Sequence, residues 1–179
     1  MKDNKNISTG VTYGVIIGLI YVLILFVRWS AATNLIKFGL YSFLGYIVIL
    51  GLLCYEAFQR RKLNEGFISL KSLFQTLFIS VLIFELLYSI YTYIHLTYID
   101  PTVGDRMREG MQEMFDKMGE GLSDADKDKA MERMGDIKRA TELPQMVKSY
   151  LSSVAISGIF ALIISAIVKK KKPVFEEIN

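Results

Sequence analysis

The feature that most constrains this chain is the gathering of its apolar residues into four long blocks. The blocks run over residues 11–27, 38–58, 73–98 and 147–168, and charged stretches separate them. Each block approaches or exceeds the about 20 residues that an α-helix needs to cross the hydrocarbon core of a bilayer. The chain of 179 residues is 52% hydrophobic, which is more than a soluble domain usually contains. We therefore predict an all-α integral membrane protein, a single domain built as a bundle of four transmembrane helices.

Lysine and arginine predict the orientation of this bundle. They precede the first block, fill the connection between the second and third blocks, and follow the fourth block as Lys169–Lys172. Cytoplasmic segments of membrane proteins carry such an excess. We expect both termini in the cytoplasm of a bacterium, an inner-membrane location, and residues 100–145 outside. Because the positive charge borders apolar segments, we expect the lipid bilayer as a partner and no nucleic acid.

The first block also admits a second interpretation. Small residues at Ser30-Ala31-Ala32 follow a basic start and an apolar run, which is the order found in a cleaved signal peptide. The run is longer than the apolar part of most signal peptides, and Arg28 and Trp29 come before the small residues. We expect the helix to be retained.

Small residues recur at intervals of four in and beside two of the blocks. This spacing places them on one face of a helix. Such a face lets two backbones approach closely, which is how helices associate in lipid. We predict that the two faces pack against each other within one chain, and a homodimer through one of them is the alternative. The residues are Gly10, Gly14 and Gly18 at the first block and Ser153, Ser157, Ala161 and Ser165 in the fourth.

Glu85 lies in the middle of the third block, where a charged side chain is costly. We expect its face of the helix to point inward and the aliphatic face to point to lipid. The inward residues are Tyr88, Ser89, Thr92 and His95, and the aliphatic ones are Ile83, Leu87, Ile90 and Ile94.

The other helices are expected to bring Tyr21, Tyr46 and Ser157 to the depth of Glu85, and no lysine or arginine. We therefore predict a protonated carboxyl group, hydrogen-bonded to a hydroxyl group. Two interpretations stay open: a proton or cation site, and an interhelical hydrogen bond without a further role. Glu56 lies four residues before Arg60 near the end of the second block, and we expect an ion pair there that reaches the membrane surface.

The segment 100–145 is expected to form an external helical hairpin, with helices over residues 102–119 and 124–141. Methionines recur on its apolar faces, and methionine adapts to many contact surfaces. We predict a surface for a membrane or periplasmic protein partner, and packing of the hairpin on itself or on the membrane surface is the alternative that stays open. Copper(I), a soft ion that thioethers bind, is the alternative that we consider weaker. The methionines are Met107, Met111, Met114, Met118, Met131 and Met134.

The sequence carries no hydrolase or nucleotide-binding signature and no metal-ligand motif. Its only histidine, His95, and only cysteine, Cys54, lie at different depths, so they cannot form a catalytic pair. We expect neither catalysis nor a cofactor. The predicted role is a non-enzymatic scaffold or accessory subunit, and the alternative is a small ion or proton pathway, built by a homo-oligomer around Glu85.

Two short segments carry a resemblance to a known family. They are "RRKLNEGFISLKSLFQT", which leads into the third block, and "YIDP" at residues 98–101. In order and spacing they resemble a Bacteroidota-type membrane family classed as domain of unknown function 4199. The resemblance covers residues 10–168 and implies four helices, a basic cytoplasmic loop and a helical insert before the fourth helix. It implies no catalytic residue.

Overall fold

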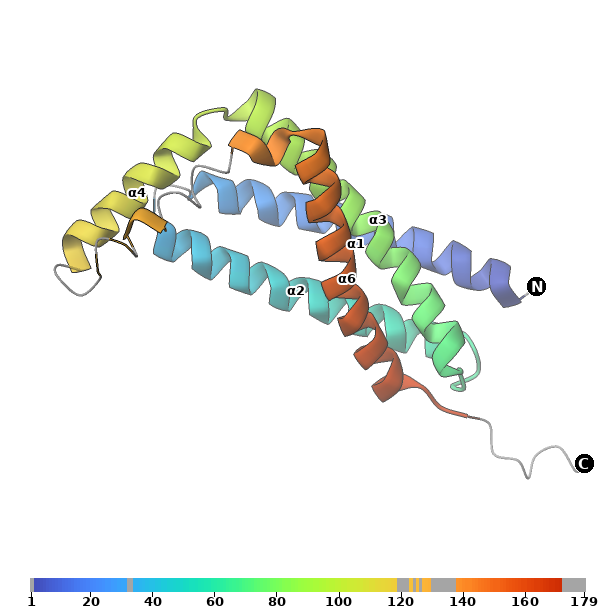
Figure 1. Cartoon of the computed structure of the whole chain (residues 1–179). Coiled ribbons are helices and arrows are strands. Elements are labelled where there is room, and N and C mark those ends of the chain that lie inside the picture. Colours follow the sequence, from blue (N-terminus) through green and yellow to red (C-terminus); the bar gives the residue numbers. More distant parts are fainter. Residues whose placement is uncertain are drawn as a thin grey trace, which may run out of the picture.

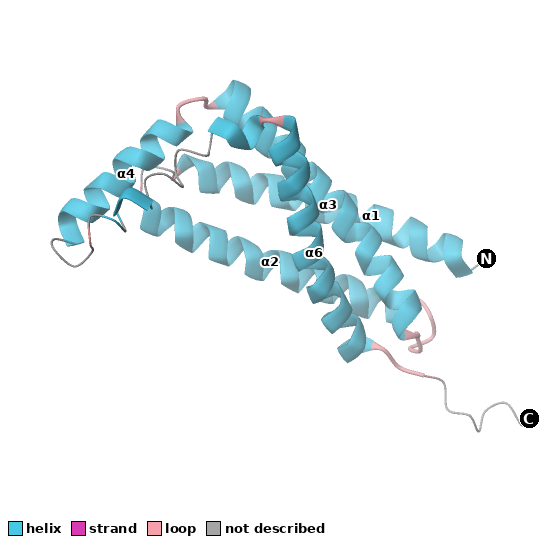
Figure 2. Ribbon diagram, viewed as in Figure 1, coloured by secondary structure: helices cyan, strands magenta, loops and turns pink. Residues whose placement is uncertain are grey.

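The computed structural model of the chain is a bundle of four long helices with a shorter helix at one end (Figure 1). It describes residues 2–31, 34–118, 123, 125, 127–129 and 138–171. Within these residues there is no β-strand (Figure 2). The elements are α1 (Lys2–Ser30), α2 (Leu35–Lys62), α3 (Leu70–Ile94), the π-helical turn η1 (His95–Ile99), α4 (Val103–Met118), the 3-10 turn η3 (Lys138–Thr141) and α6 (Leu143–Val168).

The predicted fold class is confirmed. The four long helices are each long and apolar enough to cross a membrane. Each expected block lies within one of them, with η1 continuing α3, and the helices extend past the blocks because polar residues add turns at their ends. The start of α1 and the end of α6 lie at the same end of the bundle (Figure 1).

Local sequence signals define where the helices begin. The side chain of Asn34 accepts a hydrogen bond from the backbone N–H of Lys37, and Ser69 does the same for Ser72, so these residues cap α2 and α3. The turn before Ser69 passes through Gly66, whose φ of +83° is favourable for glycine alone. Gly66 and the cap at Ser69 thus define the connection between α2 and α3, and Asn34 defines the start of α2.

Helix α3 is the centre of the bundle. It packs most extensively on α1 and next on α6, and it lies between them in the fold (Figure 1). Leu73, Leu77, Val81 and Phe84 project from α3 into the core with at most 1% of their surface exposed. Any site that uses inward-facing residues of α3 is therefore shielded from lipid by three other helices.

The predicted pairing of the two small-residue faces is wrong. Gly10 and Gly14 contact α3 instead: a Cβ atom built on Gly10 would lie 2.6 Å from the carbonyl oxygen of Thr76. On Gly14 it would lie 2.9 Å from the Cβ of Ile83. A Cβ atom built on Gly18 would likewise clash with the side chain of Leu87 on α3. A spacing of four identifies a face suited to close approach, but it does not identify the helix that approaches.

The other small-residue face, on α6, is turned into the bundle. Ala161 and Ser165 are fully buried, and Ser157 donates a hydrogen bond to α3. Among the long helices, α6 packs mainly on α3 and next on α2.

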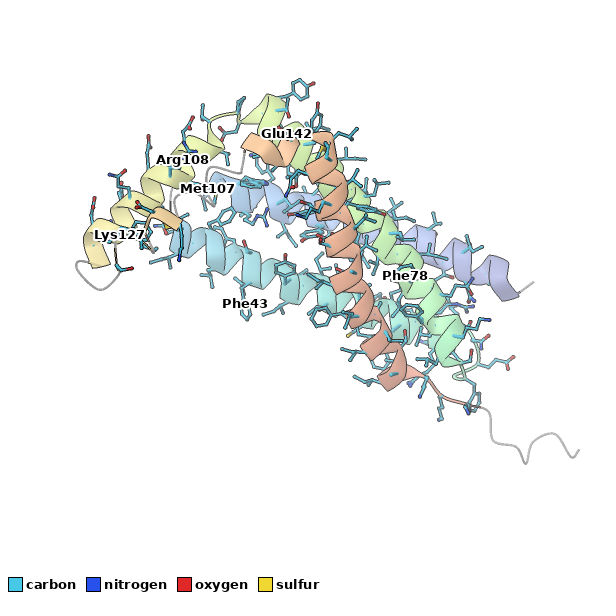
Figure 3. The ribbon with its side chains drawn as sticks, in the orientation of Figure 1. Phe43, Phe78, Met107, Arg108, Lys127 and Glu142 are labelled. Atoms are coloured by element: carbon cyan, nitrogen blue, oxygen red, sulfur yellow. The ribbon has the colours of Figure 1, made fainter. Side chains whose placement is uncertain are left out.

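The lipid face of α3 also differs from the prediction. Ile83 and Leu87 face the glycines of α1 because these glycines leave room for them. Ile90 and Ile94 are exposed as predicted, and Leu86 takes the place of the other two on the exposed aliphatic face of α3. The outer face of α2 is the most open one of the bundle, and Phe43 points away from it with 63% of its surface exposed (Figure 3).

Helix α4 lies close to the expected first helix of the insert, but its methionines do not form an open surface. Met107 is 5% exposed and Met111 is 9% exposed, because they pack against the bundle, while the neighbouring Arg108 is exposed (Figure 3). These two methionines are therefore not available to a partner, contrary to the prediction. Met114 is half-buried. Met131, Met134 and the side chain of Met118 lie outside the described residues, as does most of the expected second helix.

Candidate functional site

Glu85 lies in the interior of the bundle with 4% of its surface exposed. The hydroxyl oxygen of Ser157, on α6, lies 2.6 Å from its Oε1 atom and donates to it. The side chain of Glu85 borders a cavity of about 120 Å3, and Tyr21 and Tyr46 also line this cavity. The three residues expected at the depth of Glu85 therefore all lie around it, and the cavity is large enough to hold water.

The residues predicted to share the face of Glu85 lead from this cavity to the end of the bundle that carries α4. Tyr88 stacks on Tyr21 with ring centroids 5.1 Å apart. Thr92 and His95 follow further along, and the Nδ1 atom of His95 lies 3.2 Å from the hydroxyl oxygen of Tyr91. Tyr88, Ser89 and Thr92 line a second cavity, of about 190 Å3.

A second buried carboxyl group belongs to Glu56, which is fully enclosed by the bundle. The predicted ion pair with Arg60 is wrong: within the described part of the chain, the ion pairs are Arg106–Asp100 and Lys117–Glu113. Glu56 points toward α3 instead, where its Oε1 atom lies 2.6 Å from the hydroxyl oxygen of Ser80. The spacing of four residues was compatible with an ion pair between Glu56 and Arg60. Packing against α3 and α1 instead directs Glu56 to Ser80 and Arg60 to Asn6.

The contacts of Ser80 indicate the protonation state of Glu56. The hydroxyl oxygen of Ser80 also lies 2.8 Å from the backbone carbonyl oxygen of Gly10. A hydroxyl group has one proton and donates it once. Both contacts are satisfied when a protonated Glu56 donates to Ser80 and Ser80 donates to Gly10. The Oε2 atom of Glu56 is buried without a partner, which costs far less for a neutral carboxyl group than for an ionised one.

Arg60 takes part in a separate buried cluster at the end of the bundle where α1 begins. Its Nη2 atom donates to Oδ1 of Asn6 over 2.6 Å, and the hydroxyl group of Ser72 donates to the same oxygen over 3.0 Å. The side-chain amide of Asn6 donates to Gln75 over 3.2 Å. Asn6 and Arg60 are 1% and 4% exposed. This cluster joins α1, α2 and α3.

Our sequence reasoning missed Glu56, Ser80 and Asn6 as a site. One available signal was the row of Ser72, Thr76 and Ser80, which are spaced by four and form a polar face on the first half of α3. Chemically, the site offers two carboxyl groups that can take up and release protons. Within the described residues, no three histidine, cysteine or acidic side chains are grouped to hold a metal ion.

Comparison with known proteins gives a family and no function. The chain matches the model of a family described as "Protein of unknown function (DUF4199)" over residues 12–170. No curated protein and no solved structure matches the chain.

Proposed function

We propose, from the premise that this chain belongs to the DUF4199 family of unknown function, that it is a non-enzymatic membrane protein that exchanges protons at Glu85 and Glu56. The observation that carries the proposal is the environment of these two carboxyl groups. Each is at most 4% exposed, and each lies 2.6 Å from a serine hydroxyl group on a neighbouring helix. Neither forms an ion pair within the described residues.

The positions of the two groups suit transfer along the bundle. Ser80, which contacts Glu56, and Glu85 are five residues apart on α3, or about 7.5 Å along the helix axis. The polar cluster of Arg60 and Asn6 lies toward one end, and the polar face from Tyr88 to His95 leads to the other. An ionised carboxylate in this interior is costly, so a proton that leaves one group has to be replaced quickly. Ser80 and Ser157, the hydroxyl partners of the two carboxyl groups, and water in the cavity beside Glu85 are the groups that would provide such replacement.

Proton flux into liposomes tests this function. We expect the purified full chain to carry protons when a potassium gradient with an ionophore imposes a membrane potential, as measured with an enclosed pH-sensitive dye. Glu85→Gln and Glu56→Gln keep the shape and the hydrogen-bonding capacity of the side chain but cannot release a proton. Each is expected to reduce the flux to that of empty liposomes.

Glu113→Gln is the matched control for this experiment, because the Glu113 side chain lies on α4 with 71% of its surface exposed. Its flux is expected to equal that of the wild type. Size-exclusion profiles of all variants verify the fold. Equal flux from the wild type and from well-folded Glu85→Gln and Glu56→Gln would assign both carboxyl groups to helix packing alone.

A second candidate role is the binding of a protein partner, or of a second copy of the chain, by the insert. One observation favours it: Met114 borders a groove of about 280 Å3 between α4 and the start of α2, beside Ile36, which is 78% exposed. The test compares how the wild type and a Met114→Asp variant capture a membrane or periplasmic protein. Equal capture by both would exclude this groove as the binding surface.

The same proposal places the protein in the bacterial inner membrane with both termini in the cytoplasm. Its support is the distribution of charge, since Arg60, Arg61 and Lys62 end α2 and Lys169 and Lys170 follow α6 at the same end of the bundle. Cytoplasmic ends of helices carry this excess. Activity after Lys62 of a fused reporter that works only outside the cytoplasm would show that the orientation is reversed.

A further inference from the structure

Arg28 lies in an environment that its sequence position did not predict. Arg28 directly follows the first apolar block in the sequence, yet it belongs to the last turn of α1 and is only 8% exposed. Its guanidinium carbon lies 4.7 Å from the ring centroid of Trp29 and 5.1 Å from that of Phe38. These aromatic faces hold the side chain in place and provide part of its stabilisation.

No side chain of the described residues neutralises this arginine. Its Nε atom is buried and has no hydrogen-bond partner. The ion pairs of the described residues involve other arginine and lysine residues. A buried charge without a partner is strongly unfavourable in a protein interior. Among the described residues, this largely buried cation therefore has no anionic partner, and an anion from outside the chain would complement it.

Arg28 borders the cavity of about 190 Å3 that Tyr88, Ser89 and Thr92 also line, which we call the Arg28 pocket. Its walls come from α1, α3, η1, η3 and α6. None of the described residues that line it is acidic. The lining residues are Arg28, Trp29, Tyr88, Ser89, Thr92, Tyr93, Leu96, Ala140, Met146 and Ser149.

Other polar groups around the Arg28 pocket also lack partners. The indole Nε1 of Trp29 and the hydroxyl oxygen of Thr92 are buried and make no hydrogen bond. The Nε2 atom of His95, whose ring stacks on Trp29 with centroids 5.5 Å apart, is buried and without a partner too. Buried polar groups are normally hydrogen-bonded. Several such atoms beside a cation that no described acidic residue pairs with indicate a site for a ligand that accepts hydrogen bonds.

We propose that the Arg28 pocket binds a phosphate group. A guanidinium group pairs with phosphate or carboxylate oxygens through two parallel hydrogen bonds. The additional donors, Trp29 and Thr92, match the larger number of oxygen atoms on a phosphate group. The pocket is smaller than the about 300 Å3 that drug-sized ligands occupy, which suits one phosphate group and little more. Inorganic phosphate and the head group of a phospholipid both present this chemistry.

Thermal unfolding of the purified full chain tests the proposal. The protein is heated in a non-ionic detergent with potassium phosphate, with potassium acetate, or with potassium chloride at matched ionic strength. A further sample contains micelles of short-chain phosphatidic acid, and its control contains micelles of phosphatidylcholine. We expect phosphate or phosphatidic acid to raise the midpoint above its control, and acetate to raise it less. A rise with phosphate identifies a free anion, and a rise with phosphatidic acid alone identifies a lipid head group.

Two variants attribute the effect to the pocket. Arg28→Gln is expected to weaken the affinity, measured from the concentration dependence of the midpoint, by about tenfold or more. Thr92→Val, which keeps the shape of the side chain and removes its hydroxyl group, is expected to weaken it by a smaller factor and remains informative if Arg28→Gln does not fold. Arg108→Gln, an exposed position on α4, is expected to bind as the wild type does. The absence of any phosphate-specific rise, or an equal rise in Thr92→Val and the wild type, would overturn the proposal.

Discussion

Gly14→Leu is expected to lower the free energy of unfolding by about 3 kcal/mol or more, as overpacking of a filled interface does. Even a Cβ atom on Gly14 would lie 3.0 Å from the Cα and from the carbonyl oxygen of Ser80. Those are backbone atoms, which cannot turn away as the end of a flexible side chain can. Leucine therefore has to separate α1 from α3. Unfolding in mixed detergent micelles, followed by circular dichroism, measures the loss.

Gly51→Leu is the matched control for this prediction. Gly51 also lies within a membrane-spanning helix, but a Cβ atom there would meet no other atom within 4 Å. We expect a change within about 0.5 kcal/mol, as for other exposed positions. Equal stability of Gly14→Leu and the wild type would show that α1 does not pack on α3 through its glycines.

Asn6→Ala is expected to cost about 3 kcal/mol. The substitution removes the oxygen that accepts from Arg60 and Ser72 and the amide that donates to Gln75. A buried group that loses its partner is destabilising by about 1–3 kcal/mol, and by more when it is charged. The substitution leaves the charged guanidinium group of Arg60 buried and without the oxygen to which it donates. The effect is measured by the same unfolding assay.

Asn6→Asp and Thr12→Ala are the comparisons for this substitution. The aspartate keeps both accepting contacts and adds a charge that attracts Arg60, so we expect a smaller loss than for alanine. Thr12 is an exposed residue of α1 that donates to the backbone of Ser8, and its replacement is expected to matter little. A loss of the same size for aspartate and alanine would contradict the role of Oδ1 as the acceptor for Arg60.

Much of the fold follows from the sequence because the dominant physical effect is local. A run of about 20 apolar residues forms a membrane-spanning helix whatever its neighbours are. The inward direction of Glu85 was predictable as well, since a carboxyl group avoids lipid and the polar residues after it recur at helical spacing. Its contact with Ser157 agrees with the expected depth of the two residues.

The neighbours of each helix were not predictable in the same way. The glycines of α1 would fit any helix that presents a complementary surface, and Ile83 and Leu87 supplied it. The position of Glu56 near the end of its block made an exposed ion pair plausible, but α3 lies close enough to provide Ser80. The burial of Arg28 was not predictable either, because the additional turn of α1 that buries it has no distinct sequence signal.

The protonation state of the buried carboxyl groups tests the central claim most directly. Infrared spectra of the reconstituted protein separate the carbonyl band of a protonated carboxyl group from the bands of a carboxylate. We predict that the wild type at neutral pH shows protonated bands that are absent from Glu85→Gln and Glu56→Gln respectively, and that shift on transfer to heavy water because the protons exchange. Spectra in which both substitutions remove only carboxylate bands, or in which the protonated bands never exchange, would contradict the account.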